Sequence, residues 1–139
     1  MTIDLPDALS RIHDLDLPSL DALGFGVIAF DAHGLVQRYN ACESLYSGLL
    51  PAQVIGRRLF KDIAPCMNNH LVARRFEAAM AGGTALDATI DYLLTWRMRP
   101  SQVRLRLLHE PTCDLSYLLL TPKDPASTTR ALGELPQLL

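Results

Sequence analysis

The sequence has no excess of charge of either sign, because 13 Lys and Arg residues face 15 Asp and Glu residues and the net charge is −2. No run of Lys and Arg offers the electrostatic footprint that nucleic-acid phosphates require, so we expect no nucleic-acid partner. No apolar run reaches the length of a membrane-spanning helix, so we expect no membrane partner. The N-terminus also lacks the basic segment of a secretion signal.

Cysteine is scarce as well, with three residues whose spacing matches no disulfide framework. An odd number of cysteines suits a reducing compartment better than a disulfide-bonded secreted domain, so we expect a cytoplasmic protein. The histidines are scattered without the short spacing of metal ligands. No metal site is predicted, and each histidine is expected at the surface: His13, His33, His70 and His109.

What is present suits one globular domain of 139 residues, with 49% hydrophobic and 20% charged side chains. Apolar residues at helix-like spacing over residues 6–21 predict one or two short helices, interrupted at Pro18. An apolar strand over 25–31 and a second strand over 35–39 flank an Asp/Gly turn. This arrangement predicts a β-hairpin.

The middle of the chain is predicted to be helical. Asn40 is expected to cap a helix, with Glu43 three residues later at the spacing of a capping box. Short turns and helical pieces follow. A longer helix is predicted over residues 70–81, with Asn68 or Asn69 as its cap and an apolar stripe along one side. Two consecutive glycines end it.

Three strands complete the pattern. The first is predicted over residues 86–98 and the last over 117–120. Between them, apolar residues of the segment 103–107 alternate with Arg104 and Arg106, which predicts one buried face and one solvated face. The order strand-strand, helices, three strands predicts an α+β fold: a five-stranded antiparallel sheet with a helical crossover.

We divide the chain accordingly into an N-terminal helical cap at 1–20, a main domain at 21–122 and a C-terminal tail at 123–139. The tail is rich in Pro, Ser, Thr and Ala. It is expected to be flexible, with a weak helix near its end.

Two short motifs bring together groups with distinctive chemistry. Cys66 ends the run Lys61-Asp62-Ile63-Ala64-Pro65-Cys66, and upstream lies Tyr39-Asn40-Ala41-Cys42-Glu43. A thiol can carry an acyl group, while a phenol and a carboxyl can hold a phenolate oxygen by hydrogen bonds. Simpler interpretations stand beside this one. Cys66 could pack as a small hydrophobe, and Glu43 could complete the capping box.

Several stretches of the sequence resemble the photoactive yellow protein family, a branch of the PAS domains. The resemblance holds from about residue 20 to 121 and rests on these motifs: Leu20-Asp21-Ala22-Leu23-Gly24-Phe25-Gly26, Gln37-Arg38-Tyr39-Asn40-Ala41, Gln53-Val54-Ile55-Gly56, Phe60-Lys61-Asp62-Ile63-Ala64-Pro65-Cys66 and Met98-Arg99-Pro100. It implies the PAS fold and a p-coumaric acid (4-hydroxycinnamic acid) chromophore, attached as a thioester to Cys66.

The same resemblance implies roles for individual residues. Tyr39 and a protonated Glu43 would each donate a hydrogen bond to the phenolate oxygen of the chromophore. Ser47 stands where the family usually has a threonine that bonds the tyrosine, and Leu49 where it often has an arginine that covers the pocket. Further residues of the binding site, by the same comparison, are Ile28, Ala64, Pro65, Tyr92, Leu94, Trp96 and Met98.

The function implied is a blue-light photoreceptor. Light would isomerise the chromophore from trans to cis, Glu43 would give up its proton, and partial unfolding, chiefly of residues 1–20, would signal to an unknown downstream protein. One alternative is a PAS module that binds another ligand or dimerises. Another is an enzyme with Cys66 as its nucleophile and His70 as the base, although no oxyanion-hole motif accompanies them.

Overall fold

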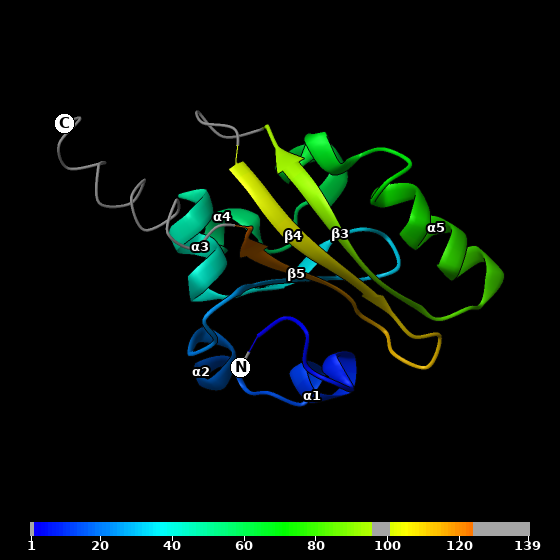
Figure 1. Cartoon of the computed structure of the whole chain (residues 1–139), viewed down its shortest axis with the longest axis horizontal. Helices are drawn as coiled ribbons and strands as arrows, with labels where there is room; N and C mark the ends of the chain where they lie inside the picture. The colour runs from blue at the N-terminus through cyan, green and yellow to red at the C-terminus, as the bar shows by residue number, and fades with distance from the viewer. Residues whose placement is uncertain (1, 96–100, 124–139) are drawn as a thin grey trace, which may run out of the picture.

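A five-stranded antiparallel sheet organises the chain, with strand order β2-β1-β5-β4-β3. The computed structural model describes residues 2–95 and 101–123. The predicted sheet is confirmed (Figure 1), with the following strands: β1 Gly26–Phe30, β2 Val36–Tyr39, β3 Leu86–Leu94, β4 Ser101–His109 and β5 Ser116–Pro122.

The predicted hairpin is also confirmed, since β1 pairs antiparallel with β2. Its turn is held by the Asp31 carboxylate, whose Oδ1 accepts hydrogen bonds from the backbone N–H groups of His33 (2.9 Å) and Leu35 (3.0 Å). Gly34 follows with φ of 80°, a left-handed conformation that glycine adopts without strain. On its other edge β1 pairs with β5, so β1 is a central strand.

Helices precede the sheet and fill the crossover between β2 and β3. The described helices are α1 Ala8–His13, α2 Leu17–Asp21, α3 Ala41–Ser47, α4 Pro51–Val54, the π-helical turn η1 Leu59–Ile63, the 3₁₀ turn η2 Pro65–Met67 and α5 Ala73–Gly82. None of these is long and apolar enough to cross a membrane. In Figure 1, α1 and α2 lie together along the lower side of the view, apart from α3, α4 and α5.

Two helix boundaries differ from the prediction. Pro18 lies in the first turn of α2 instead of interrupting a helix, because its fixed φ and missing N–H suit a helix start. The helix predicted over 70–81 begins only at Ala73. Asn69 does not cap it: its Oδ1 accepts from the N–H groups of Leu71 and Val72 and forms a separate turn before the helix.

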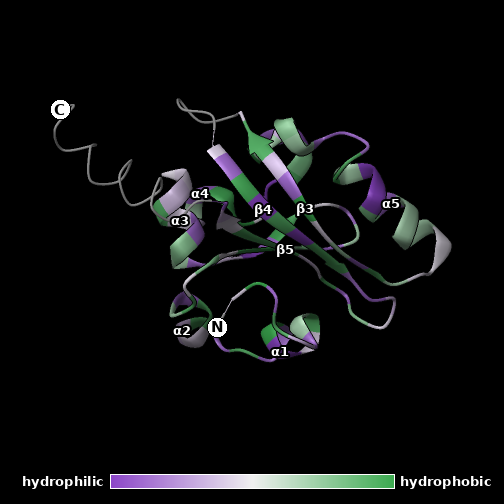
Figure 2. Ribbon diagram, viewed as in Figure 1, coloured by the Kyte–Doolittle hydropathy of each residue, from purple (hydrophilic) through white to green (hydrophobic). Residues whose placement is uncertain are grey.

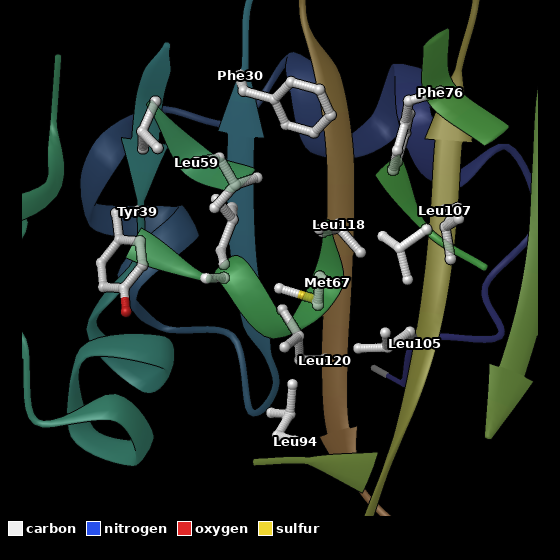
Figure 3. Packing of buried hydrophobic residues seen from close by; sticks show 14 of the residues in the cluster. Phe30, Tyr39, Leu59, Met67, Phe76, Leu94, Leu105, Leu107, Leu118 and Leu120 are labelled. Carbon is white, nitrogen blue, oxygen red and sulfur yellow. The ribbon is translucent and has the colours of Figure 1, made fainter. Parts of the chain in front are cut away.

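Each face of the sheet carries a buried apolar cluster, and alternate residues of β3 stay exposed. The crossover face carries a cluster that includes Phe30, Met67 and Phe76, and leucines of β4 and β5 point into the same space (Figure 3). Its members are Ile28, Phe30, Val36, Tyr39, Val54, Leu59, Ala64, Met67, Val72, Phe76, Leu94, Val103, Leu105, Leu107, Leu118 and Leu120. We call this set the crossover core.

A second cluster fills the opposite face, beneath the N-terminal cap. It contains Ile3, Leu5, Ala8, Ile12, Leu20, Phe25, Val27, Ala29, Leu108, Tyr117 and Leu119, and we call it the cap core. Polar and apolar residues alternate along β4, as Figure 2 shows, which is the pattern predicted for residues 103–107.

The expectation of a fully solvated arginine face is wrong for Arg106. The Arg106 side chain is 11% exposed, whereas that of Arg104 is 44% exposed. Arg106 Nη1 donates to the carbonyl oxygens of Ile3 and Leu5, each at 2.7 Å, and its guanidinium pairs with Asp87 at 2.8 Å. The N-terminal cap therefore covers a part of the sheet that the alternation of polar and apolar residues predicts to be exposed to solvent.

The histidines also differ in part from the prediction. His33 and His70 are exposed as expected. His109 is buried at the end of β4, where it pairs with Leu86 of β3, and its Nδ1 lies 2.9 Å from Ser116 Oγ of β5. His13 is half-buried against Tyr117. Residues 124–139 of the predicted tail, and the predicted site residues Trp96 and Met98, lie outside the described residues.

Candidate functional site

Tyr39 lies at the end of β2 and is 2% exposed. Its hydroxyl donates to Ser47 Oγ at 2.6 Å, across to the last residue of α3. Ser47 Oγ also accepts from the Leu49 N–H at 3.1 Å, which orients the serine. Figure 3 shows the Tyr39 hydroxyl pointing toward α3. The predicted Tyr39–Ser47 pair is therefore present, and Leu49 adjoins it through its backbone.

Glu43 projects from the first turn of α3 and is fully buried, with 0% exposure. The space for its carboxyl exists because residue 26 is glycine. A Cβ at Gly26 would lie 2.7 Å from Glu43 Oε1 and 3.1 Å from Glu43 Cβ. Such a distance is a steric clash, so the central strand β1 accommodates the carboxyl only where it has no side chain.

The capping-box interpretation of Glu43 is wrong. Asn40 does cap α3, since its Oδ1 accepts from the Glu43 N–H at 3.1 Å. The donor that a capping box would use, the Asn40 N–H, donates instead to the Val27 carbonyl at 3.2 Å. The Glu43 carboxyl is therefore not used to complete the cap and faces the protein interior beside Gly26.

Asn40 has a wider role than sequence reasoning assigned to it. The side chain is fully buried, and Oδ1 accepts a second bond from the Val27 N–H at 2.9 Å. Its Nδ2 donates to the carbonyls of Leu20 (3.0 Å) and Phe25 (2.9 Å). One amide thus joins α3 to β1 and to the segment that leads from the N-terminal cap. Capping patterns reveal only one of these bonds, because the others depend on tertiary structure.

Cys66 lies in the 3₁₀ turn η2 and is partly buried. Its carbonyl oxygen accepts from the Tyr92 hydroxyl at 2.5 Å and from Asn69 Nδ2 at 3.1 Å, and Nδ2 also lies 2.7 Å from the Tyr92 hydroxyl. These bonds fix the backbone that carries the thiol. Sequence reasoning placed Tyr92 at the site but missed Asn69, whose amide has no distinguishing sequence pattern.

The other two cysteines differ from Cys66 in their surroundings. Burial raises the pKa of the Cys42 thiol, and a hydrogen bond with Tyr46 opposes part of this rise. Because the thiolate is the nucleophile, Cys42 is poorly suited to form a thioester. Cys113 lies between β4 and β5, on the turn that meets the cap.

Most of the predicted site residues meet in or at the crossover core. Ile28, Tyr39, Ala64 and Leu94 belong to this core, and Leu49, Cys66 and Tyr92 pack against it. Ile28 and Tyr39 are also register partners in the β1–β2 pair. Pro65 is exposed and does not join the core; it begins the turn that carries Cys66. A thiol and a phenol are thus placed around one apolar interior, and the buried Glu43 carboxyl lies beside Gly26 of β1.

Known proteins share both the sequence and the fold. Residues 20–124 match the family described as PAS fold. Over 117 residues the chain is 32% identical to Photoactive yellow protein of Rhodothalassium salexigens, covering 84% of this chain and 90% of that protein. Over 104 residues it is 35% identical to Photoactive yellow protein of Halochromatium salexigens, covering 75% and 80% respectively.

A solved structure gives the same result. The photoactive yellow protein domain of the sensor histidine kinase Ppr from Rhodospirillum centenum superposes with a TM-score of 0.74 and 33% sequence identity. The match covers 81% of this chain and 97% of that domain. The predicted PAS fold is confirmed by this likeness and by the strand order of the sheet.

Proposed function

The chain belongs to the photoactive yellow protein family, and on this premise we propose that it is a blue-light photoreceptor with p-coumaric acid bound as a thioester to Cys66. The observation that carries the proposal is the fully buried Glu43 carboxyl in the space left by Gly26. Burial of a carboxyl favours its neutral form, which can donate a hydrogen bond. A bound phenolate oxygen needs such hydrogen-bond donors away from water.

The residues present fit this group at both ends. Full burial favours the neutral form of a carboxyl, and neutral Glu43 can donate a hydrogen bond. The Tyr39 hydroxyl would turn its proton from Ser47 to the phenolate, while the Ser47 hydroxyl rotates and donates to Tyr39. Such hydrogen bonds to a charged oxygen are about twice as strong as neutral ones.

Attachment requires a reactive thiol at the other end. Cys66 Sγ would form a bond to the acyl carbon of an activated coumaroyl ester, whose activating group leaves with the thiol proton. Asn69 and Tyr92 hold the Cys66 carbonyl and so set the direction of the side chain. When bound, the group supplies a double bond that light isomerises from trans to cis.

The response of the protein begins at Glu43. In the proposed step the O–H bond of Glu43 breaks, and its proton forms a new O–H bond on the phenolate oxygen. The carboxylate that remains is buried, a state that costs several kcal/mol. Asn40 caps the helix that carries Glu43 and bonds the Leu20 and Phe25 carbonyls, so strain in α3 reaches the N-terminal cap.

We propose that loosening of residues 1–20 is the output, read by a downstream signalling protein in the cytoplasm. A histidine kinase contains the related domain from Rhodospirillum centenum, which supports a signalling role. We propose no enzymatic role: His70, the candidate base for Cys66, is exposed.

The test is reconstitution of the purified full chain with an activated ester of p-coumaric acid. We expect visible absorption, a mass gain of a single coumaroyl group and bleaching under blue light. Cys66→Ala should remain colourless, whereas the matched control Cys42→Ala should react like the original chain. Covalent colour in Cys66→Ala, or no colour in the original chain, would contradict the proposal.

A second function is favoured by the surface near the site. Leu45 and Leu50 are 66% and 63% exposed, and Leu49 replaces the arginine that often covers the family's pocket. A PAS module that dimerises or binds another ligand would use such a surface. Protein purified from its own host distinguishes the two functions, because only the photoreceptor would carry the coumaroyl group there.

A further inference from the structure

Three potential metal ligands meet where the N-terminal cap touches the far end of the sheet. His13 ends α1, and Cys113 and Asp114 lie on the turn between β4 and β5, about one hundred residues later. One ligand atom from each lies within 4.8 Å of the other two. His13 Nε2 is 3.8 Å from Asp114 Oδ1. Spacing along the sequence hides this group, because the fold alone brings its members together.

The histidine ring is already oriented for a ligand. Its Nδ1 lies 2.8 Å from the Tyr117 hydroxyl, and the two rings meet edge to face with centroids 5.8 Å apart. Arg38 Nη1 donates to the same hydroxyl at 2.9 Å and to the Ile12 carbonyl at 3.2 Å. A second partner of this kind fixes the ring orientation of metal-binding histidines and leaves the other nitrogen for the metal.

The surrounding groove favours a cation. It has a volume of about 490 Å³, and the described residues that line it include no Lys or Arg. Five carboxyl side chains line it: Asp7, Asp14, Asp87, Glu110 and Asp114. Arg106 neutralises Asp87, but the other four still attract positive charge. Asp114 is 88% exposed at its side chain and can move toward an ion without loss of packing.

We propose that His13, Cys113 and Asp114 bind a divalent zinc ion, which joins the N-terminal cap to the β4–β5 turn. Imidazole, thiolate and carboxylate are all zinc ligands, whereas magnesium and calcium prefer oxygen alone. Zinc bonds of about 2.0–2.3 Å require the three ligand atoms to close in slightly from their present separations. Water would complete a tetrahedral site.

The consequence concerns the cap. An ion bound by both α1 and the turn stabilises the closed arrangement and not the open one, in proportion to its free concentration. Zinc would therefore hold residues 1–20 against the sheet and oppose their release. The site itself does not depend on the chromophore, so it can be tested on the protein without it.

The first test uses Co²⁺ as a spectroscopic probe, titrated into the full chain without chromophore, followed by competition with Zn²⁺. We expect a thiolate-to-cobalt absorption band at one equivalent, which zinc abolishes. Cys113→Ser should lose the band, and His13→Gln and Asp114→Asn should weaken binding by about tenfold or more. Cys42→Ser and Cys66→Ser, the matched controls, should keep the band. A band that survives in Cys113→Ser, or that disappears in Cys66→Ser, would overturn the proposal.

The second test measures the cap directly by tryptic cleavage after Arg11, an exposed residue of α1. Zinc should slow this cleavage in the original chain and in Cys42→Ser, but not in Cys113→Ser. Equal cleavage with and without zinc in the original chain would show that no ion joins the cap to the turn. Neither result depends on Cys66 or on light, so failure here leaves the photoreceptor proposal intact.

Discussion

The two faces of the sheet are buried by different kinds of contact. On the crossover face, side chains of β1, β4 and β5 pack against the crossover helices in one apolar cluster. On the cap face, an apolar cluster is supplemented by Arg38 and Arg106, which donate to backbone carbonyls of the cap. Arg38 Nη2 reaches Leu15 O at 2.5 Å, and Arg106 reaches Ile3 O and Leu5 O.

This difference indicates which face can open. Residues of the crossover core are held by apolar contacts that no solvent replaces, so their separation costs the free energy of the hydrophobic effect. A carbonyl released by an arginine finds water at once, and the net free energy lost for each such bond is about 1.5–3 kcal/mol. Release of the cap would also expose the apolar side chains that it contributes to the cap core, but the crossover core has more members, so we expect the cap to open first.

The largest effect is expected where the two faces are joined, at Asn40. Asn40→Ala removes four side-chain hydrogen bonds, and the buried Val27 N–H and the Phe25 carbonyl lose these partners, whereas the Leu20 carbonyl keeps the bond from the Leu23 N–H. We expect the free energy of unfolding to fall by about 3–4 kcal/mol, measured by urea denaturation. Asn68→Ala, at an exposed position, is the control and should change little. A loss below about 1 kcal/mol would show that Asn40 does not link the faces.

A smaller effect is expected on the crossover side, at Gly26. Gly26→Ala places a methyl group against the Glu43 carboxyl, and overpacking of this kind costs about 1–3 kcal/mol. The double variant Gly26→Ala/Glu43→Ala removes the carboxyl that the new methyl group would contact. We expect its loss of unfolding free energy to be smaller than the sum of the losses in the two single variants. A double-mutant cycle in urea measures this coupling. Strictly additive effects would mean that Gly26 does not make room for Glu43. Gly24→Ala, where a Cβ meets nothing within 4 Å, is the control.

The cap face should respond locally to loss of Arg106. Arg106→Gln removes the bonds to Ile3 and Leu5, so we expect faster amide hydrogen exchange in residues 3–15 and little change in the crossover core. The opening free energy of the cap should fall by about 1.5–3 kcal/mol. Arg104→Gln is the matched control on the same strand, since its nearest carboxylates lie 3.9 Å away. Equal exchange in both variants would refute this role of Arg106.

Local patterns were sufficient to predict the sheet, because alternation and turn residues act over a few residues. The hairpin turn at Asp31 and the end of α5 at Gly83 follow such rules. The same rules failed where tertiary contacts replace water or a local bond. Arg106 looked solvated because the cap that covers it lies about one hundred residues away. His109 looked exposed because its partners Leu86 and Ser116 lie on neighbouring strands that meet it only after folding.

The candidate site was predicted unevenly for the same physical reason. Tyr39, Glu43 and Cys66 were found through the family resemblance, and their chemistry agrees with their burial. Residues that act through a single amide, such as Asn69, could not be found, because their partners are backbone carbonyls that exist only after folding. The group around His13 was missed since its ligands come from opposite ends of the chain.

The smallest effect concerns pH, through Asp87 on the cap face. A hydrogen bond from Arg106 lowers the pKa of Asp87 below its ordinary value of 3.8, against the opposing effect of burial. A carboxyl whose pKa is lower in the folded state stabilises the fold at pH values above the unfolded pKa. That contribution disappears as pH falls through the pKa of Asp87 in the folded protein. The attachment of the cap through Arg106 and Asp87 should therefore weaken only below about pH 4.

Nitrogen-15 NMR of Arg106 Nε from about pH 5 to about pH 2 tests this sign, because the signal shifts when its carboxylate partner is protonated. The midpoint should lie below 3.8, and Asp87→Asn should remove the shift. Asp91→Asn, which leaves the Asp87 pair intact, is the control. A midpoint above 3.8 would mean that Asp87 is protonated more readily in the folded protein than in the unfolded one. The attachment of the cap through Arg106 and Asp87 would then weaken at a higher pH than expected. The two faces of the sheet would then differ in their sensitivity to mild acid as well as in the kind of contact that buries them.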